Sequence, residues 1–297
     1  MGVAMAKVLP LRIWLYSVVL VAAVMAVAAL YYRSARQEAG AAAAGQVQHF
    51  LADHPDRPGV RVVALGSSLL WAATPPGQYE KLEGMDWLRI TKSGSSMGYL
   101  HAVLDVLDRH PPGILVIDTN LLLPTTPDVI LEEMRYAVAT MLKAQVAKLV
   151  ARGGPGTATG MRLNDQVTMF PCEVQTPAAI RKQLASLVAQ QNSAQGRPDI
   201  DAALQARLLQ LSRRGVHIVV LEIRRSNHFE QALTHERQSW LQRWKAAMPP
   251  GPRVSYLASP DYPEPDLYCD GRHMNAAGAR RFETWWSAQL QSMAKGG

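Results

Sequence analysis

An uninterrupted apolar run near the start of the chain restricts its structure more than any other segment. From Ile13 to Tyr32 the sequence reads IWLYSVVLVAAVMAVAALYY, twenty residues without a charge. A helix rises about 1.5 Å per residue, so this run is long enough to cross a hydrocarbon core of roughly 30 Å. Aromatic residues lie at both ends of the run, where interfacial side chains are expected, and Arg12 and Arg33 bracket it. The run predicts one transmembrane helix over residues 13–32.

A cleaved signal peptide is the alternative reading of this segment. Its apolar region would be shorter, roughly 7 to 15 residues, and a small-residue cleavage site would follow directly. The small residues Ala41–Gly45 lie well beyond the run. We therefore expect an uncleaved anchor in an inner or plasma membrane.

Basic residues on both sides of the run leave its orientation open under the positive-inside rule. The simpler topology has a short cytoplasmic tail, residues 1–12, and an exported, extracytoplasmic (periplasmic) domain. Residues 33–58 are then a juxtamembrane helix or stalk that ends at Pro58.

Beyond Pro58, short apolar runs alternate with longer amphipathic segments, which predicts an α/β domain over residues 59–297. Continuous apolar strands between helices indicate a mostly parallel sheet of about five strands, covered on both faces as a three-layer α/β/α domain. The pattern breaks at about 153–198, which we read as an insertion with a helix near Ala178–Gln191. The strands are predicted at Arg61–Leu65, Trp87–Thr91, Ile114–Asp118, His217–Ile223 and Arg253–Leu257, and the helices after Ser68, at Met97–Arg109 and Asp128–Ala151, from Asp199 to Gly215, at Phe229–Met248 and after the capping residue Asn275.

Composition narrows the function classes. The chain carries a net charge of +7, but its basic residues are scattered, and no basic stripe interleaved with aromatics indicates a nucleic-acid groove. The two cysteines, Cys172 and Cys269, form no metal-binding motif, so no metal or other cofactor is predicted. In an oxidising compartment they could form a disulfide that ties the insertion to the segment before Asp270, and two separate thiols are the alternative.

Chemistry-bearing residues lie near the two ends of this domain. Ser68 follows the first predicted strand, and Asp270 and His273 precede the last helix. A serine hydroxyl needs a positioned base to act as a nucleophile; histidine supplies one, and a carboxylate fixes its tautomer. Each motif alone also fits a helix cap or a surface turn.

Together these motifs resemble the first and last blocks of SGNH (GDSL-type) hydrolases. The resemblance is carried by Gly-Ser-Ser at 66–68 and Asp-x-x-His-x-Asn-x-x-Gly at 270–278. It implies that Ser68 is the nucleophile, His273 its base and Asp270 the residue that orients the base. Ser67 stands where the family often has aspartate.

The same resemblance implies an oxyanion hole made by the amide of Ser68, Gly94 and the side chain of Asn120. The family's Gly-x-Asn-Asp block reads Asp-Thr-Asn-Leu here, at 118–121, and Gly98 could replace Gly94. An ordinary α/β-hydrolase fits less well, because Leu70 stands where its Gly-x-Ser-x-Gly motif ends.

We expect, by this resemblance, a serine esterase or O-acyltransferase that works through an acyl-enzyme. Exported, membrane-anchored members of this kind often add or remove O-acetyl groups on cell-envelope polysaccharides, frequently beside a polytopic acyl-transfer protein. The expected substrate is an acylated carbohydrate or another acyl ester, and hydrolysis and transfer both stay open. A lipase or thioesterase is one alternative; a non-catalytic scaffold or polysaccharide-binding subunit with a degenerate triad is another.

Overall fold

The structure is a computed structural model of the 297-residue chain. Gly94 and most of the helix predicted over Asp128–Ala151 lie outside the residues that it describes. Those residues are 11–52, 59–74, 84–92, 99–122, 170–193 and 200–295, with three short helical pairs between 134 and 143.

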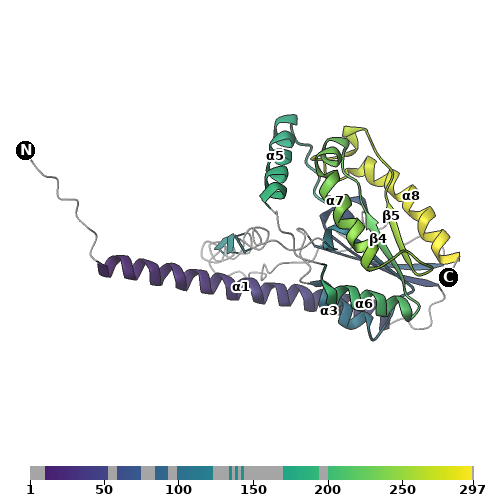
Figure 1. The fold of residues 1–297 in the computed structure, drawn as a ribbon, viewed down its shortest axis with the longest axis horizontal. Coiled ribbons are helices and arrows are strands. Elements are labelled where there is room, and N and C mark those ends of the chain that lie inside the picture. The colour runs from purple at the N-terminus through teal and green to yellow at the C-terminus, as the bar shows by residue number, and fades with distance from the viewer. Residues whose placement is uncertain are drawn as a thin grey trace, which may run out of the picture.

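One parallel sheet forms the centre of the domain, with the strand order β2-β1-β3-β4-β5 (Figure 1). This confirms the predicted α/β fold, and each predicted strand is present with ends shifted by at most two residues. The order is one of the two common doubly wound arrangements, in which ligands bind beyond the carboxyl ends of the strands. The strands are β1 Val60–Gly66, β2 Met85–Thr91, β3 Ile114–Asp118, β4 His217–Glu222 and β5 Val254–Ala258.

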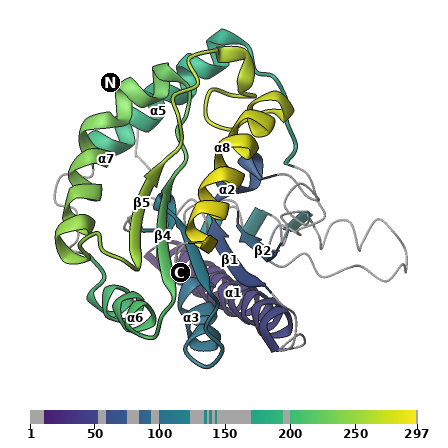
Figure 2. The same ribbon diagram turned by 90° about the vertical axis from the view of Figure 1, so that its right-hand side faces the viewer.

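Helices cover both faces of the sheet, so the domain has three layers (Figure 2). Successive strand residues point to opposite faces: Val63 and Leu65 belong to one buried cluster, and Val62 and Ala64 to the other. The first cluster packs under α1, α3, α6 and α7, and the second under α2 and α8. The helices are α1 Leu11–Ala52, α2 Ser68–Ala73, α3 Leu100–Leu107, α5 Pro177–Ser193, α6 Ala202–Arg213, α7 Asn227–Ala247 and α8 Ala276–Lys295.

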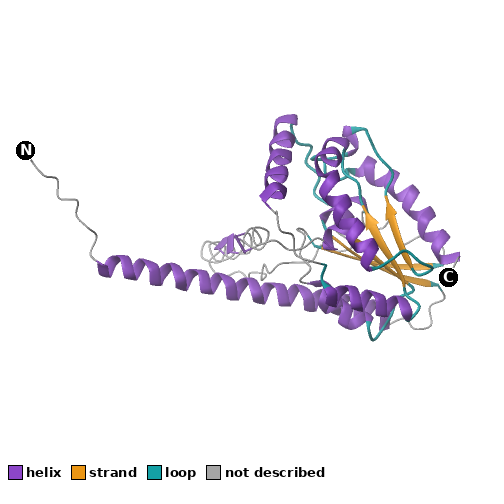
Figure 3. Ribbon diagram, in the orientation of Figure 1, coloured by secondary structure: helices purple, strands orange, loops and turns teal. Residues whose placement is uncertain are grey.

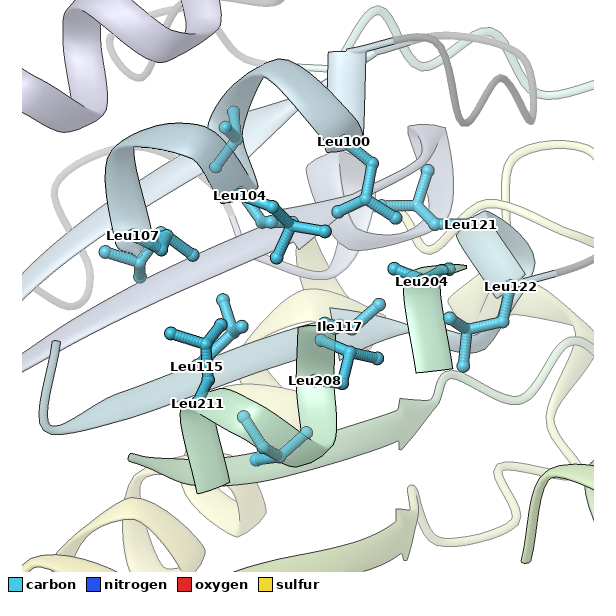
Figure 4. Close-up of a cluster of buried hydrophobic side chains, with 14 of the residues drawn as sticks. Leu100, Leu104, Leu107, Leu115, Ile117, Leu121, Leu122, Leu204, Leu208 and Leu211 are labelled. Atoms are coloured by element: carbon cyan, nitrogen blue, oxygen red, sulfur yellow. The ribbon is translucent and has the colours of Figure 1, made fainter. Parts of the chain in front are cut away.

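Leucines dominate the first cluster, between the sheet and helices α3 and α6 (Figure 4). Leu204, Leu208 and Leu211 lie along one face of α6 and are fully buried there, and the Asp201 side chain caps this helix. Burying each such side chain contributes about 1.5–3 kcal/mol. Helix α8 turns an equivalent stripe to the other face, with Phe282, Trp286 and Leu290 fully buried.

The helix α1 is continuous over 42 residues, and its first part is apolar and long enough to cross a membrane. Its second part differs from a free stalk, because it is docked on the domain. Ala35, Ala39, Ala43, Val47 and Leu51 are buried at a spacing of four residues, and the last three join the core cluster beside α3. A four-residue spacing places these side chains along one face of the helix.

Candidate active site

Ser68 lies at the turn between β1 and α2, at the carboxyl edge of the sheet. β1 ends at Gly66, and the Ser67 hydroxyl caps α2 by accepting a hydrogen bond from the Leu69 amide at 3.2 Å. The chain turns tightly here: an added Cβ on Gly66 would lie 2.4 Å from the Cβ of Leu70. The turn therefore requires glycine at position 66 and presents Ser68 beyond the end of the strand.

His273 reaches Ser68 from the other end of the domain. Its Nε2 lies 2.8 Å from Oγ of Ser68, and its Nδ1 lies 2.8 Å from Oδ2 of Asp270. A carboxylate only accepts hydrogen bonds, so Nδ1 carries the proton and Nε2 accepts from the Ser68 hydroxyl. All three predicted triad residues thus form one continuous relay, although Ser68 and His273 are 205 residues apart in the chain.

Asp270 is held in its charged form by its surroundings. Burial raises the pKa of its carboxyl, but hydrogen bonds from the His273 ring and from the amides of His273 and Arg272 outweigh burial. The net effect holds the pKa of Asp270 well below its usual range. A charged Asp270 fixes the His273 tautomer and stabilises the imidazolium that forms when the ring takes a proton.

The turn that carries this pair is tied to the start of α8. The Cys269 amide donates to the carbonyl of His273 at 2.8 Å, and Gly271 adopts a φ of +78°. The Asn275 side chain accepts from the amides of Ala277 and Gly278, which confirms the predicted helix cap. These contacts fix the His273 ring because its backbone cannot move independently of α8.

Asp118, at the end of β3, organises a network that the sequence analysis did not identify. The carboxylate is fully buried and accepts hydrogen bonds from the amide and hydroxyl of Ser67, at 3.1 and 2.5 Å, and from the amide of Asn120 at 3.0 Å. A buried carboxylate is stable only with such partners. The sequence did offer one signal for this network, since Asp118 is an acidic residue at the end of an otherwise apolar strand. It occupies the position at which the SGNH block has glycine.

Asn120 belongs to this network rather than standing apart. It is buried on a short 3-10 helix, Thr119–Leu122, directly after β3. Its Nδ2 donates to Oδ1 of Asp118 at 3.0 Å and lies 3.5 Å from Oγ of Ser67. Its Oδ1 accepts from Arg225 at 3.0 Å. Asn120 is therefore connected through Asp118 to Ser67, the neighbour of the candidate nucleophile Ser68.

Tyr99, directly before α3, stabilises the turn between β1 and α2. Its hydroxyl donates to the carbonyl of Gly66 at 2.9 Å. Burial, and then the nearby Asp118 charge, raise the pKa of Tyr99 well above its usual value, so the phenol stays a neutral donor.

The insertion also contributes to the site. Cys172 and Cys269 form a disulfide with their Cα atoms 5.5 Å apart, and the Gln175 amide donates to the carbonyl of Cys269 at 2.9 Å. This link places the Phe170 ring on the His273 imidazole, with 4.4 Å between ring centroids and 27° between planes. The rings of Trp71, on α2, and Phe170 form a T-shaped pair with 5.2 Å between their centroids. Nothing in the local sequence pattern pointed to Phe170.

His217 is separate from this site. It is the first residue of β4 and lies at the amino ends of the strands, whereas Ser68 lies beyond their carboxyl ends. It forms a hydrogen bond with the Ser255 hydroxyl at 2.8 Å. Burial and the nearby Arg253 charge lower its pKa. His217 therefore has a polar partner within the sheet, as a structural histidine requires. Within the ranges that the structure describes, no three His, Cys, Asp or Glu side chains gather at a common metal position.

Comparison of the chain with models of known protein families and with curated proteins finds no match.

Proposed function

We propose that this chain is a membrane-anchored serine enzyme of the SGNH type that transfers acyl groups through an acyl-enzyme. The observation that carries the proposal is the relay from Ser68 through His273 to Asp270, with both hydrogen bonds at 2.8 Å. Its position beyond the carboxyl ends of a doubly wound sheet supports the same reading.

The mechanism follows from the relay. His273 Nε2 takes the Ser68 proton while Oγ bonds to the acyl carbon, and the carbonyl oxygen becomes an oxyanion. The C–O bond to the leaving alkoxide then breaks, and the alkoxide takes the proton from His273. A second hydroxyl, of water or of a sugar, gives its proton to His273 as its oxygen bonds to the acyl carbon. The bond between the acyl carbon and Oγ of Ser68 then breaks, and Oγ takes the proton back from His273.

The oxyanion donors are the amide of Ser68 and, if it turns from Asp118, the amide group of Asn120. Each such donor is typically worth about 3–4 kcal/mol of barrier. Gly94, the third donor implied by the SGNH resemblance, lies outside the described residues.

The apolar part of α1 and the Cys172–Cys269 disulfide support an extracytoplasmic location, because structural disulfides persist in oxidising compartments. An enzyme anchored there meets the cell envelope. We therefore favour O-acetyl groups on envelope polysaccharides as the substrate, added or removed beside a polytopic acyl-transfer protein.

A fluorophosphonate probe tests the chemistry, because it reacts only with an activated serine. We expect covalent labelling of the full chain at Ser68 and its loss in the Ser68→Ala and His273→Gln variants. Ser292→Ala, at an exposed position of α8, is the matched control and should label normally. Absence of labelling in the unaltered chain would contradict the proposal.

A non-catalytic scaffold is the second candidate. One observation favours it: the side-chain amide of Asn120 donates its hydrogen bond to Asp118 instead of pointing to an open oxyanion position. A chain that binds an envelope polysaccharide but does not react with the probe would support it.

A further inference from the structure

The two parts of α1 couple the domain to the membrane. Within the first part, large apolar side chains such as Trp14, Leu20 and Leu30 are exposed, as expected for a surface that faces lipid. The second part is docked in the core, with Ala43 and Val47 fully buried. Because one unbroken helix contains both parts, the docked face fixes how the domain sits relative to the bilayer.

α1 runs antiparallel to β1. The Arg61 side chain, at the start of β1, donates to the carbonyl of Leu51, at the end of α1, at 2.5 Å. This contact places the end of α1 beside the start of β1. The strand arrows in Figure 3 accordingly point toward the side from which the apolar part of α1 extends.

The carboxyl edge of the sheet therefore faces the membrane, and Ser68 lies on that edge. β1 runs back alongside α1 from the level of Leu51. Its seven residues cover about 20 Å, or somewhat less when measured along the helix axis, because strand and helix cross at an angle. Tyr32, the end of the apolar run, lies 19 residues before Leu51, which is about 28 Å along the helix. The difference places the Ser68 turn within roughly 15 Å of the level of Tyr32.

We propose that the active site opens toward the bilayer and acts on acyl esters presented at the membrane surface. This rests on the proposed function of Ser68 and deepens it: the acyl group is carried by a molecule held in the same bilayer and reaches Ser68 without crossing the aqueous compartment. The opposite edge of the sheet, where His217 lies, faces away from the membrane.

Energy transfer to a dye in the bilayer tests the orientation without any need for activity. Two exposed prolines flank β5: Pro260 follows its carboxyl end, and Pro252 precedes its amino end, about 20 Å away. Both native cysteines are in the disulfide, so Pro260→Cys and Pro252→Cys each add one free thiol for a fluorophore. In vesicles containing the full chain, we expect stronger transfer from position 260. Equal or reversed transfer would overturn the orientation.

Turnover tests the substrate class. The probes are a water-soluble acetate ester and the same ester attached to a vesicle lipid by a short linker. Seven residues inserted as helix between Arg33 and Ser34 rotate the docked face by only about 20° relative to the apolar part of α1. They move the domain about 10 Å farther from the membrane along the helix axis. We expect it to lower cleavage of the lipid-held ester at least tenfold, with cleavage of the soluble ester unchanged. A flexible Gly/Ser insertion of equal length is the control and should restore part of the loss.

The outcomes separate the two proposals. If neither ester is cleaved by the unaltered chain, the proposed function fails, and the energy-transfer order still decides the orientation. If only the soluble ester is cleaved, or if the helical insertion has no effect on the lipid-held ester, the membrane-surface inference fails and the proposed function stands.

Discussion

The hydroxyl of Ser67 donates a hydrogen bond to Oδ2 of Asp118, with 2.5 Å between the two oxygens. The contact joins the residue before the candidate nucleophile to the end of the neighbouring strand β3. Asp118 also accepts from the backbone and side chain of Asn120, so one carboxylate positions both the turn before the candidate nucleophile and a candidate oxyanion donor.

Replacing Asp118 with asparagine should destabilise the fold as well as the site. The new amide nitrogen would face donors, which leaves at least one buried polar group without a partner and costs about 1–3 kcal/mol. Urea unfolding of the full chain in detergent measures this. The control is Asp105→Asn, which removes an exposed partner of Arg207 and should cost less than about 1 kcal/mol. Equal losses in the two variants would show that Asp118 does not organise the turn.

Asp270→Asn should lower ester turnover by roughly 10⁴-fold, because the His273 ring loses the partner that fixes its tautomer. Initial rates with a soluble acetate ester measure the effect. A turnover within tenfold of the unaltered chain would exclude Asp270 from the relay.

The same variant tests the lowered pKa of Asp270. Its folded pKa lies below the unfolded value of about 3.9, so its contribution to stability is complete above that value and is lost as the pH falls through the folded pKa. The unaltered chain should therefore be more stable than Asp270→Asn at pH 6, and the difference should shrink below about pH 4. Unfolding at a series of pH values measures the gap, and a gap that widens on acidification would contradict the pKa shift.

Reduction of the Cys172–Cys269 disulfide should expose His273. The link closes a long stretch of chain, because its two cysteines are 97 positions apart, and its loss should cost about 2–4 kcal/mol of stability. It should also release Phe170 from the imidazole, so modification of His273 by diethyl pyrocarbonate becomes severalfold faster. Mass spectrometry of the His273 peptide measures the rate.

Three variants separate the contribution of the disulfide from that of the Phe170 ring. Cys172→Ser with Cys269→Ser should show the fast modification with or without reductant. Phe170→Ala should match the fast rate while the disulfide stays intact, and Phe170→Tyr, which keeps a ring, should not. A slow rate in Phe170→Ala would show that Phe170 does not shield His273.

Glycine substitutions probe the tight turn before Ser68. Gly66→Ala places a methyl group against Leu70 and should destabilise the domain by about 1–3 kcal/mol. Gly45→Ala meets nothing within 4 Å on the docked part of α1 and should stabilise by about 0.5–1 kcal/mol. Urea unfolding compares the two, and a Gly66→Ala chain that is as stable as the unaltered chain or more stable would contradict the close approach at Gly66.

Local pattern was sufficient for much of the fold. The β3 strand was predicted with its observed ends because Ile114–Asp118 is a short apolar run bounded by prolines and glycine. The cap at Asn275 was also readable, since it depends on residues within one helical turn. The helix predicted to open at Asp199 is instead capped by Asp201. The pairing of Asp270 with His273 is local in the same sense.

Contacts between distant segments were not readable in this way. Asp118 and Ser67 lie 51 residues apart, and their partnership depends on β1 and β3 being neighbours in the sheet. Phe170 reaches His273 because a disulfide joins the insertion to the turn that carries Asp270 and His273. The alanines of α1 looked like a free stalk, because small side chains produce little amphipathic contrast before they are packed.

The sequence by itself determined an apolar run long enough to cross a membrane, the alternation of strands and helices, and the residue types that the proposed chemistry needs. These follow from periodicity, propensity and side-chain chemistry, which act over a few residues. Only the tertiary structure decided that Ser68 meets His273, that Asp118 holds the turn, and that the carboxyl ends of the strands point toward the side from which the apolar part of α1 extends. Those relationships arise from packing between elements far apart in the chain, where side-chain shape and burial select one arrangement.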